Sequence, residues 1–162
     1  EKKPLYHFYP GSYIFSAGSY GCNLSCAFCQ NHAISRRQAA ARYVSPEELA
    51  AFSRKEGKSN IGVAFTYNEP LIAPEYLLDC AALLHEQEQK VVLVTNGFIL
   101  PEPLKMILPF IDAMNIDVKA FRPLFYSGIC RGVLDDVKRT VEISAGKCHV
   151  EVTTLVIPGL NQ

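Results

Sequence analysis

The sequence has no excess of either charge, because 16 Lys and Arg residues balance 16 Asp and Glu residues. Proteins that bind nucleic acids or anionic membrane surfaces usually carry a surplus of positive charge, so the composition favours neither partner. The sequence also lacks an apolar run as long as a membrane span, and its first residues lack the apolar core of a secretory signal. We therefore expect a cytoplasmic protein with no membrane and no nucleic-acid partner.

An initiator Met is absent as well, and the chain stops directly after a strand-like run, with no helix to cover that strand. With 49% hydrophobic residues among 162, the chain can bury one sizeable core, and two domains would be crowded. We expect a single domain over residues 1–162 that is a fragment of a longer protein, with residues 1–11 as an irregular lead-in.

Strand-like and helix-like segments alternate along the chain, without hairpin signals between them. The strand-like runs are apolar through their length, as expected when helices cover a parallel sheet. We expect strands at 12–18, 61–67, 91–94, 113–116 and 149–157. The sequence therefore predicts an α/β fold, whose active site lies at the carboxyl ends of the strands.

The helix predictions depend on capping signals and on apolar spacing. Ser45 precedes Pro46, and Glu48 three residues after Ser45 completes a capping box, so a helix is expected from there to about Lys55. Segment 35–42 has no clear period. Further helices are expected at 74–84, 102–110 and 134–141.

Three of the six cysteines lie close together in the loop after the first predicted strand, at Cys22, Cys26 and Cys29. Thiolates at this spacing can bind one soft metal centre, either zinc or an iron–sulfur cluster. Three ligands leave one position open, unless His32 completes a structural zinc site. The remaining cysteines show no pairing pattern and are interpreted as buried thiols: Cys80, Cys130 and Cys148.

The pattern Cys-x3-Cys-x2-Cys, with Phe28 directly before the last cysteine, resembles that of the radical S-adenosylmethionine (SAM) superfamily. The resemblance implies that the three cysteines bind three irons of a [4Fe–4S] cluster and that SAM chelates the fourth. It also implies reductive cleavage of SAM to a 5′-deoxyadenosyl radical that abstracts a hydrogen atom, with a flavodoxin- or ferredoxin-type protein as electron donor. The implied fold is a partial (β/α)6-type TIM barrel, truncated here to about five βα units.

Polar motifs at the other predicted strand ends extend this resemblance. Asn68-Glu69-Pro70 occupies the place of the family's Gly-Gly-Glu-Pro motif, which binds the SAM amino group, and Asn68 departs from it. Thr95-Asn96-Gly97 and Asp117-Val118-Lys119 resemble activase segments that contact the SAM ribose and methionine carboxylate, and the turn at 156–159 resembles the one that backs the adenine. The implied SAM-binding set is Phe28, Cys29, Gln30, Asn68, Glu69, Thr95, Asn96, Asp117, Lys119 and Val156.

Longer stretches, at 1–11, 65–72, 114–121 and 152–161, resemble the AmmeMemoRadiSam-system branch of the superfamily, which is similar to pyruvate formate-lyase activating enzyme. This resemblance implies an oxidoreductase that activates or modifies a protein or peptide substrate, although no motif implies which one. The alternative from the residues is a non-catalytic iron–sulfur or zinc-binding module that serves electron transfer or assembly.

Overall fold

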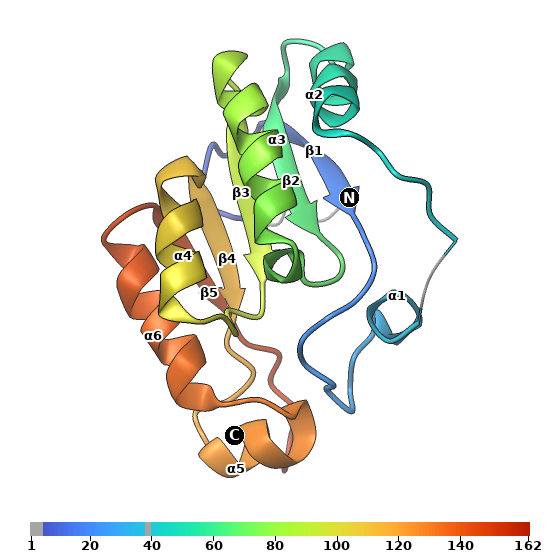
Figure 1. Ribbon diagram of the computed structural model, residues 1–162. Helices are drawn as coiled ribbons and strands as arrows, with labels where there is room; N and C mark the ends of the chain where they lie inside the picture. The colour runs from blue at the N-terminus through green and yellow to red at the C-terminus, as the bar shows by residue number, and fades with distance from the viewer. Residues whose placement is uncertain (1–4, 38–39) are drawn as a thin grey trace.

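The computed structural model describes residues 5–37 and 40–162, and its centre is one parallel sheet of five strands (Figure 1). The strands are paired in chain order, so each one lies between the strands that precede and follow it in the sequence. Their bounds are β1 Tyr13–Gly18, β2 Asn60–Thr66, β3 Lys90–Thr95, β4 Ala113–Asp117 and β5 His149–Thr153. The predicted α/β fold is confirmed.

Four longer helices connect the strands and lie on one face of the sheet (Figure 1): α2 Pro46–Lys55, α3 Pro74–Glu86, α4 Pro101–Ile107 and α6 Leu134–Ala145. The predicted capping box is present at the start of α2, because the Ser45 hydroxyl accepts from the Glu48 N–H at 3.2 Å and the Glu48 carboxylate accepts from the Ser45 N–H at 3.0 Å. The helix predicted at 102–110 is divided into α4 and a 3₁₀ turn, Leu108–Phe110.

The larger part of the core lies between the sheet and these helices. The predicted stripe on α3, Leu77, Ala81 and Leu84, is fully buried there. On the other face of the sheet, the lead-in residues Leu5 and Phe8 pack in a smaller cluster with side chains of three strands, Ala64, Val92 and Ala113. The described part of the lead-in therefore packs on the face of the sheet opposite the helices. Residues 1–4 lie outside the described residues.

The predicted fifth strand is too long, because β5 ends at Thr153 rather than at residue 157. Its partner β4 ends opposite it, at Asp117, so the following residues have no strand to pair with. Instead, the Asn161 side-chain amide donates to the Leu155 carbonyl and the Thr154 hydroxyl donates to the Val118 carbonyl, at 2.7 and 2.8 Å. This segment therefore forms part of the rim at the carboxyl ends of the strands.

Short helical pieces occur outside the helices that the sequence predicted. Helix α1, His32–Ser35, follows the cysteine loop, and residues 38–39 of the segment without a clear period lie outside the described residues. Between β4 and α6 the chain forms α5, Pro123–Phe125, and a π-helical turn, Tyr126–Cys130. Within the described ranges, no helix is long and apolar enough to cross a membrane.

Candidate functional site

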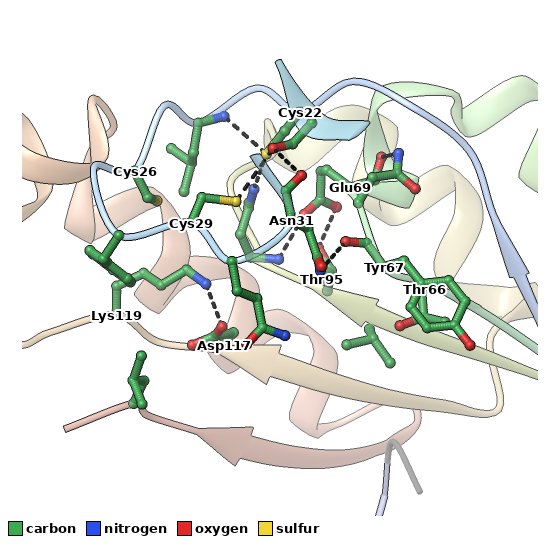
Figure 2. Close-up of a pocket in the computed structure, with 18 of the residues that line it drawn as sticks. Cys22, Cys26, Cys29, Asn31, Thr66, Tyr67, Glu69, Thr95, Asp117 and Lys119 are labelled. Atoms are coloured by element: carbon green, nitrogen blue, oxygen red, sulfur yellow. Dashed lines mark hydrogen bonds and ion pairs between the residues drawn. The ribbon is translucent and has the colours of Figure 1, made fainter. Parts of the chain in front are cut away.

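The carboxyl ends of the strands surround one cavity of about 390 Å³ (Figure 2). Its lining combines the loop after β1 with the residues that follow β2, β3 and β4. Of the cluster and SAM residues implied by the sequence, those that line the cavity are Cys22, Cys26, Phe28, Cys29, Gln30, Asn68, Glu69, Thr95, Asn96, Asp117 and Lys119. Val156 does not line the cavity, whereas its neighbour Leu155 does.

The cysteine loop is irregular, but its backbone is held by other segments. The Gly21 N–H donates to the Ile34 carbonyl at 2.8 Å, which closes the base of the loop. The Ser25 and Ala27 N–H groups donate to carbonyls of the π-helical turn, Cys130 at 2.9 Å and Ile129 at 3.1 Å. Because these bonds come from both sides, the loop presents its three sulfurs from a supported backbone.

Two asparagines fasten this loop to the end of β2. The Asn68 side chain accepts from the Ser19 N–H at 3.0 Å and donates to the Ser19 hydroxyl at 2.8 Å and to the Gly21 carbonyl at 3.0 Å. The Asn31 side chain donates to the Tyr67 carbonyl at 2.6 Å. Asn31 was not predicted as a site residue, because its partner is distant in the sequence and an asparagine after a cysteine motif is not informative by itself.

Glu69 connects the ends of β2 and β3 through a buried carboxylate, which is 1% exposed. It accepts from the Thr95 hydroxyl at 2.6 Å, the Asn96 N–H at 2.8 Å and the Leu71 N–H at 3.0 Å. Burial raises the pKa of Glu69 by disfavouring its charged form, while these donors and the positive charge of Lys119 oppose that rise. The carboxylate therefore fixes the Thr95-Asn96 turn against the cavity.

Asp117 and Lys119 form an ion pair on the wall of the cavity (Figure 2). Burial alone would lower the pKa of Lys119, whose side chain is 16% exposed, but the Asp117 carboxylate beside it raises this pKa overall. The Tyr126 hydroxyl accepts from the Lys119 N–H at 2.9 Å and helps to fix the pair. The other carboxylate oxygen, Asp117 Oδ1, is buried and has no hydrogen-bond partner among the described residues.

The groups that line the cavity suit an iron–sulfur cluster together with a ligand that carries a carboxylate and hydrogen-bond donors. Three thiols provide soft ligands, Lys119 provides a partner for a carboxylate, and the unpartnered Asp117 oxygen is an acceptor for a hydroxyl or ammonium donor. An orphaned buried acceptor costs free energy until a donor reaches it, which explains why a ligand with such donors would bind there.

The electrostatic environments of the thiols differ. Burial raises the pKa of Cys22. In contrast, a hydrogen bond with the Cys130 thiol lowers the pKa of Cys26 to about 7, and Lys119 adds to this effect. The same contact, together with burial, raises the pKa of Cys130, which therefore remains the protonated donor. The prediction of a buried thiol is confirmed for Cys130 and Cys80 and is wrong for Cys148, which is only partly buried at the start of β5.

The alternative zinc site is not supported by the geometry. His32 is exposed and lies outside the cavity lining, with its ring Nδ1 3.2 Å from the Cys29 carbonyl oxygen. Within the ranges that the structure describes, no three His, Cys, Asp or Glu side chains surround a single metal ion. A cubane cluster distributes its thiolates over separate irons, so its ligands lie further apart than those of one ion.

A model of the radical SAM superfamily matches residues 17–162. The chain belongs to the radical SAM superfamily. The family's cofactors are a [4Fe–4S] cluster and SAM, so the expectation for the cofactors and the family resemblance are both confirmed. The match covers the end of β1, the cysteine loop and all of β2 to β5.

Two relatives extend this result. The chain is 38% identical over 165 residues to an uncharacterised protein of Methanocaldococcus jannaschii, MJ0808, with 99% of this chain and 48% of the relative covered. It is 31% identical over 146 residues to the pyruvate formate-lyase-activating enzyme of Clostridium pasteurianum, with 83% of this chain and 60% of the relative covered. The chain therefore spans about half the length of these relatives.

Among solved structures, the fold is similar to that of SuiB from Streptococcus suis, which has been crystallised with SAM. The TM-score is 0.61 at 16% identity, and the match covers 86% of this chain and 34% of SuiB. A second SuiB structure contains its precursor peptide SuiA. At this identity the likeness concerns the fold alone, and it is consistent with the predicted partial barrel.

Proposed function

We propose that this chain is the core domain of an enzyme in which Cys22, Cys26 and Cys29 hold three irons of a [4Fe–4S] cluster and SAM occupies the fourth. The observation that carries the proposal is the shared cavity, in which three thiols meet polar side chains from three other strand ends. When bound, the cluster and SAM supply a 5′-deoxyadenosyl radical by reductive cleavage, and this radical abstracts a hydrogen atom from the substrate.

The residues around the cavity divide the binding of SAM between them. Lys119 neutralises the methionine carboxylate, and the unpartnered Asp117 oxygen accepts from a ribose hydroxyl. The backbone carbonyls around Asn68 and Glu69 accept from the amino group, because protein donors already occupy the Glu69 carboxylate. Thr95 supports SAM binding indirectly, because its hydroxyl donates to the Glu69 carboxylate and fixes the position of Glu69.

The apolar side of the cavity limits the access of water to the reacting atoms. Phe28 packs on Phe125 with 5.8 Å between the ring centroids, and Leu24 lies buried behind the cysteine loop. Gln30 lines the cavity at an exposed position, and the turn that contains Val156 follows the lining residue Leu155, on the side that we assign to the adenine. Exclusion of water protects a reactive radical from side reactions.

We propose further that the substrate is a protein or peptide and that the enzyme is activase-like. This rests on the similarity to the pyruvate formate-lyase-activating enzyme of Clostridium pasteurianum and on the fold shared with SuiB, which binds a precursor peptide. A flavodoxin- or ferredoxin-type protein in the cytoplasm would supply the electron.

The decisive experiment is anaerobic reconstitution of the full-length protein with iron and sulfide, followed by reduction with dithionite and addition of SAM. Release of 5′-deoxyadenosine is expected from the wild type and from Cys80→Ala, whose thiol is buried on α3 outside the cavity lining. Cys22→Ala, Cys26→Ala and Cys29→Ala should each lose the cluster. A brown wild-type protein that leaves SAM intact would instead indicate a non-catalytic iron–sulfur module, and a colourless protein with one zinc would indicate a structural site.

A further inference from the structure

The side chain of Asn96 faces the cysteine loop, and its orientation is fixed by its partners. The Phe98 N–H can only donate, and it lies 2.7 Å from Asn96 Oδ1, so the amide nitrogen must point the other way. That nitrogen, Nδ2, donates to Asn23 Oδ1 at 2.9 Å and to Cys22 Sγ at 3.5 Å. Asn23 is oriented independently, because its own amide nitrogen donates to the Phe98 carbonyl.

We propose that Asn96 is a positioning residue that sets the reduction potential of the cluster through an N–H···S hydrogen bond to Cys22. The proposal rests on the proposed function, because it requires Cys22 to be a cluster ligand. In this role Asn96 acts on the cluster through a thiolate and does not contact the SAM ribose. Both hydrogens of its amide are already engaged, which leaves no free side-chain donor for a nucleotide.

A hydrogen bond to a ligand sulfur changes the reduction potential through the charge of the cluster. A cluster gains one negative charge on reduction, and part of that charge is carried by its thiolate sulfurs. A donor aimed at a sulfur stabilises the reduced state more than the oxidised state and thereby raises the potential. Asn96 is 6% exposed, so water cannot easily replace the hydrogen bond once the side chain is removed.

Cys22 differs from the other two ligands in the hydrogen-bond donors that reach its sulfur. Its sulfur also accepts from the Leu24 N–H at 3.4 Å, so both of its donors are N–H groups that other bonds or the backbone hold in place. Cys29 instead lies 3.3 Å from the Ser35 hydroxyl, which also donates to the Asn31 carbonyl and can serve only one acceptor at a time. Cys26 accepts from the Cys130 thiol, and an S–H group is a weak donor. Among the described residues, Asn96 is therefore the side chain that donates an N–H to a ligand sulfur.

The test is a potentiometric titration of the reconstituted full-length protein, read by the EPR signal of the reduced cluster. In Asn96→Leu, which keeps the size of the side chain and removes the donor, the ratio of reduced to oxidised cluster at a fixed potential should fall roughly threefold to tenfold. A tenfold fall corresponds to about 59 mV for one electron. Asn23→Ala is the matched control, because the Phe98 N–H still holds Asn96 Oδ1 and keeps Nδ2 directed at Cys22. Its ratio should stay within about twofold of the wild type.

A second measurement uses the wild-type protein, so it does not require a variant to fold. Wild-type protein containing asparagine labelled with ¹⁵N in the side chain should show a ¹⁵N coupling to the reduced cluster by pulsed EPR. Equal potentials in wild type and Asn96→Leu, an equal fall in Asn23→Ala, or the absence of the ¹⁵N coupling would each overturn the role of Asn96. If the wild type carries no cluster at all, the proposed function itself fails, which is a distinguishable result.

Discussion

The Thr95 hydroxyl donates to the Glu69 carboxylate at 2.6 Å, and this bond joins the ends of β2 and β3 below the cavity. The same oxygen of Glu69 accepts from the Leu71 N–H, and the other oxygen accepts from the Asn96 N–H. All these groups are buried, so each must be satisfied by the others. The turn that carries Asn96 toward Cys22 therefore depends on the Glu69 carboxylate.

We predict that Glu69→Gln destabilises the fold. The three donors share two carboxylate oxygens in the wild type, whereas the amide of glutamine has only one acceptor oxygen. The expected loss in the free energy of unfolding is about 1–3 kcal/mol. Urea denaturation of the protein without cofactors measures this loss. Thr95→Val removes one donor to the carboxylate and the acceptor of the Gly97 N–H, yet it leaves the Leu71 and Asn96 N–H groups on Glu69. It should therefore cost less than Glu69→Gln, and the reverse order would contradict the central role of the carboxylate.

Lys119→Met should weaken SAM binding without removing the cluster. The substitution keeps an apolar stem but loses the charge that we propose to pair with the methionine carboxylate, so the Kd for SAM should rise roughly tenfold to a hundredfold. Equilibrium binding to the reconstituted protein measures the Kd, and iron analysis checks the cluster. Lys119→Arg, which keeps the charge, should bind better than Lys119→Met; equal affinities for all three proteins would remove Lys119 from the site.

Asn68→Gly places the family's residue at this position, yet we expect it to weaken this protein. The change removes the side-chain bonds to Ser19 and to the Gly21 carbonyl, which hold the cysteine loop to β2. The reconstituted cluster should bleach in air severalfold faster, on the order of the 1 kcal/mol that a typical hydrogen bond contributes. Asn68→Asp keeps the acceptor for the Ser19 N–H and should bleach at an intermediate rate. Identical rates would show that Asn68 does not fasten the loop.

The sequence predicted those parts of the site that depend on local patterns. The capping box of Ser45 and Glu48 predicted the start of α2. The three cysteines and the polar residues at the strand ends predicted one site at the carboxyl edge of the sheet. The contacts that the sequence did not predict are hydrogen bonds between residues that are remote in the sequence. They join Cys130 to Cys26, Asn31 to Tyr67, and Glu151 to Tyr6, and the last two residues are 145 positions apart. Local propensity carries no information about such pairs. The end of β5 was misplaced for a related reason, because a strand ends where its neighbour ends.

Glu151 makes a pH-dependent contribution to stability. Its side chain, 13% exposed on β5, accepts from the Tyr6 and His7 N–H groups of the lead-in, each at 2.8 Å, and from the His149 ring at 3.0 Å. Burial alone would raise the pKa of Glu151, but these donors outweigh it and lower the pKa from the ordinary 4.5 to about 2.

Because the folded pKa of Glu151 is lower than the unfolded value, the unfolded chain binds the proton more readily between the two values. The stabilisation is therefore fully present above pH 4.5 and is lost as the pH falls toward about 2. We expect Glu151→Gln to reduce the fall in the free energy of unfolding between about pH 5 and about pH 3, measured by urea denaturation at each pH. An unchanged pH dependence would separate Glu151 from the acid sensitivity of the fold.

The central claim is that three sulfurs hold a cluster whose remaining iron is open to SAM. The EPR spectrum of the dithionite-reduced full-length protein, recorded with and without SAM, tests it most directly. We predict a reduced-cluster spectrum that changes when SAM is added and that is absent from Cys26→Ala. A spectrum that SAM leaves unchanged, or protein that binds zinc and takes up no iron under reconstitution, would contradict the claim.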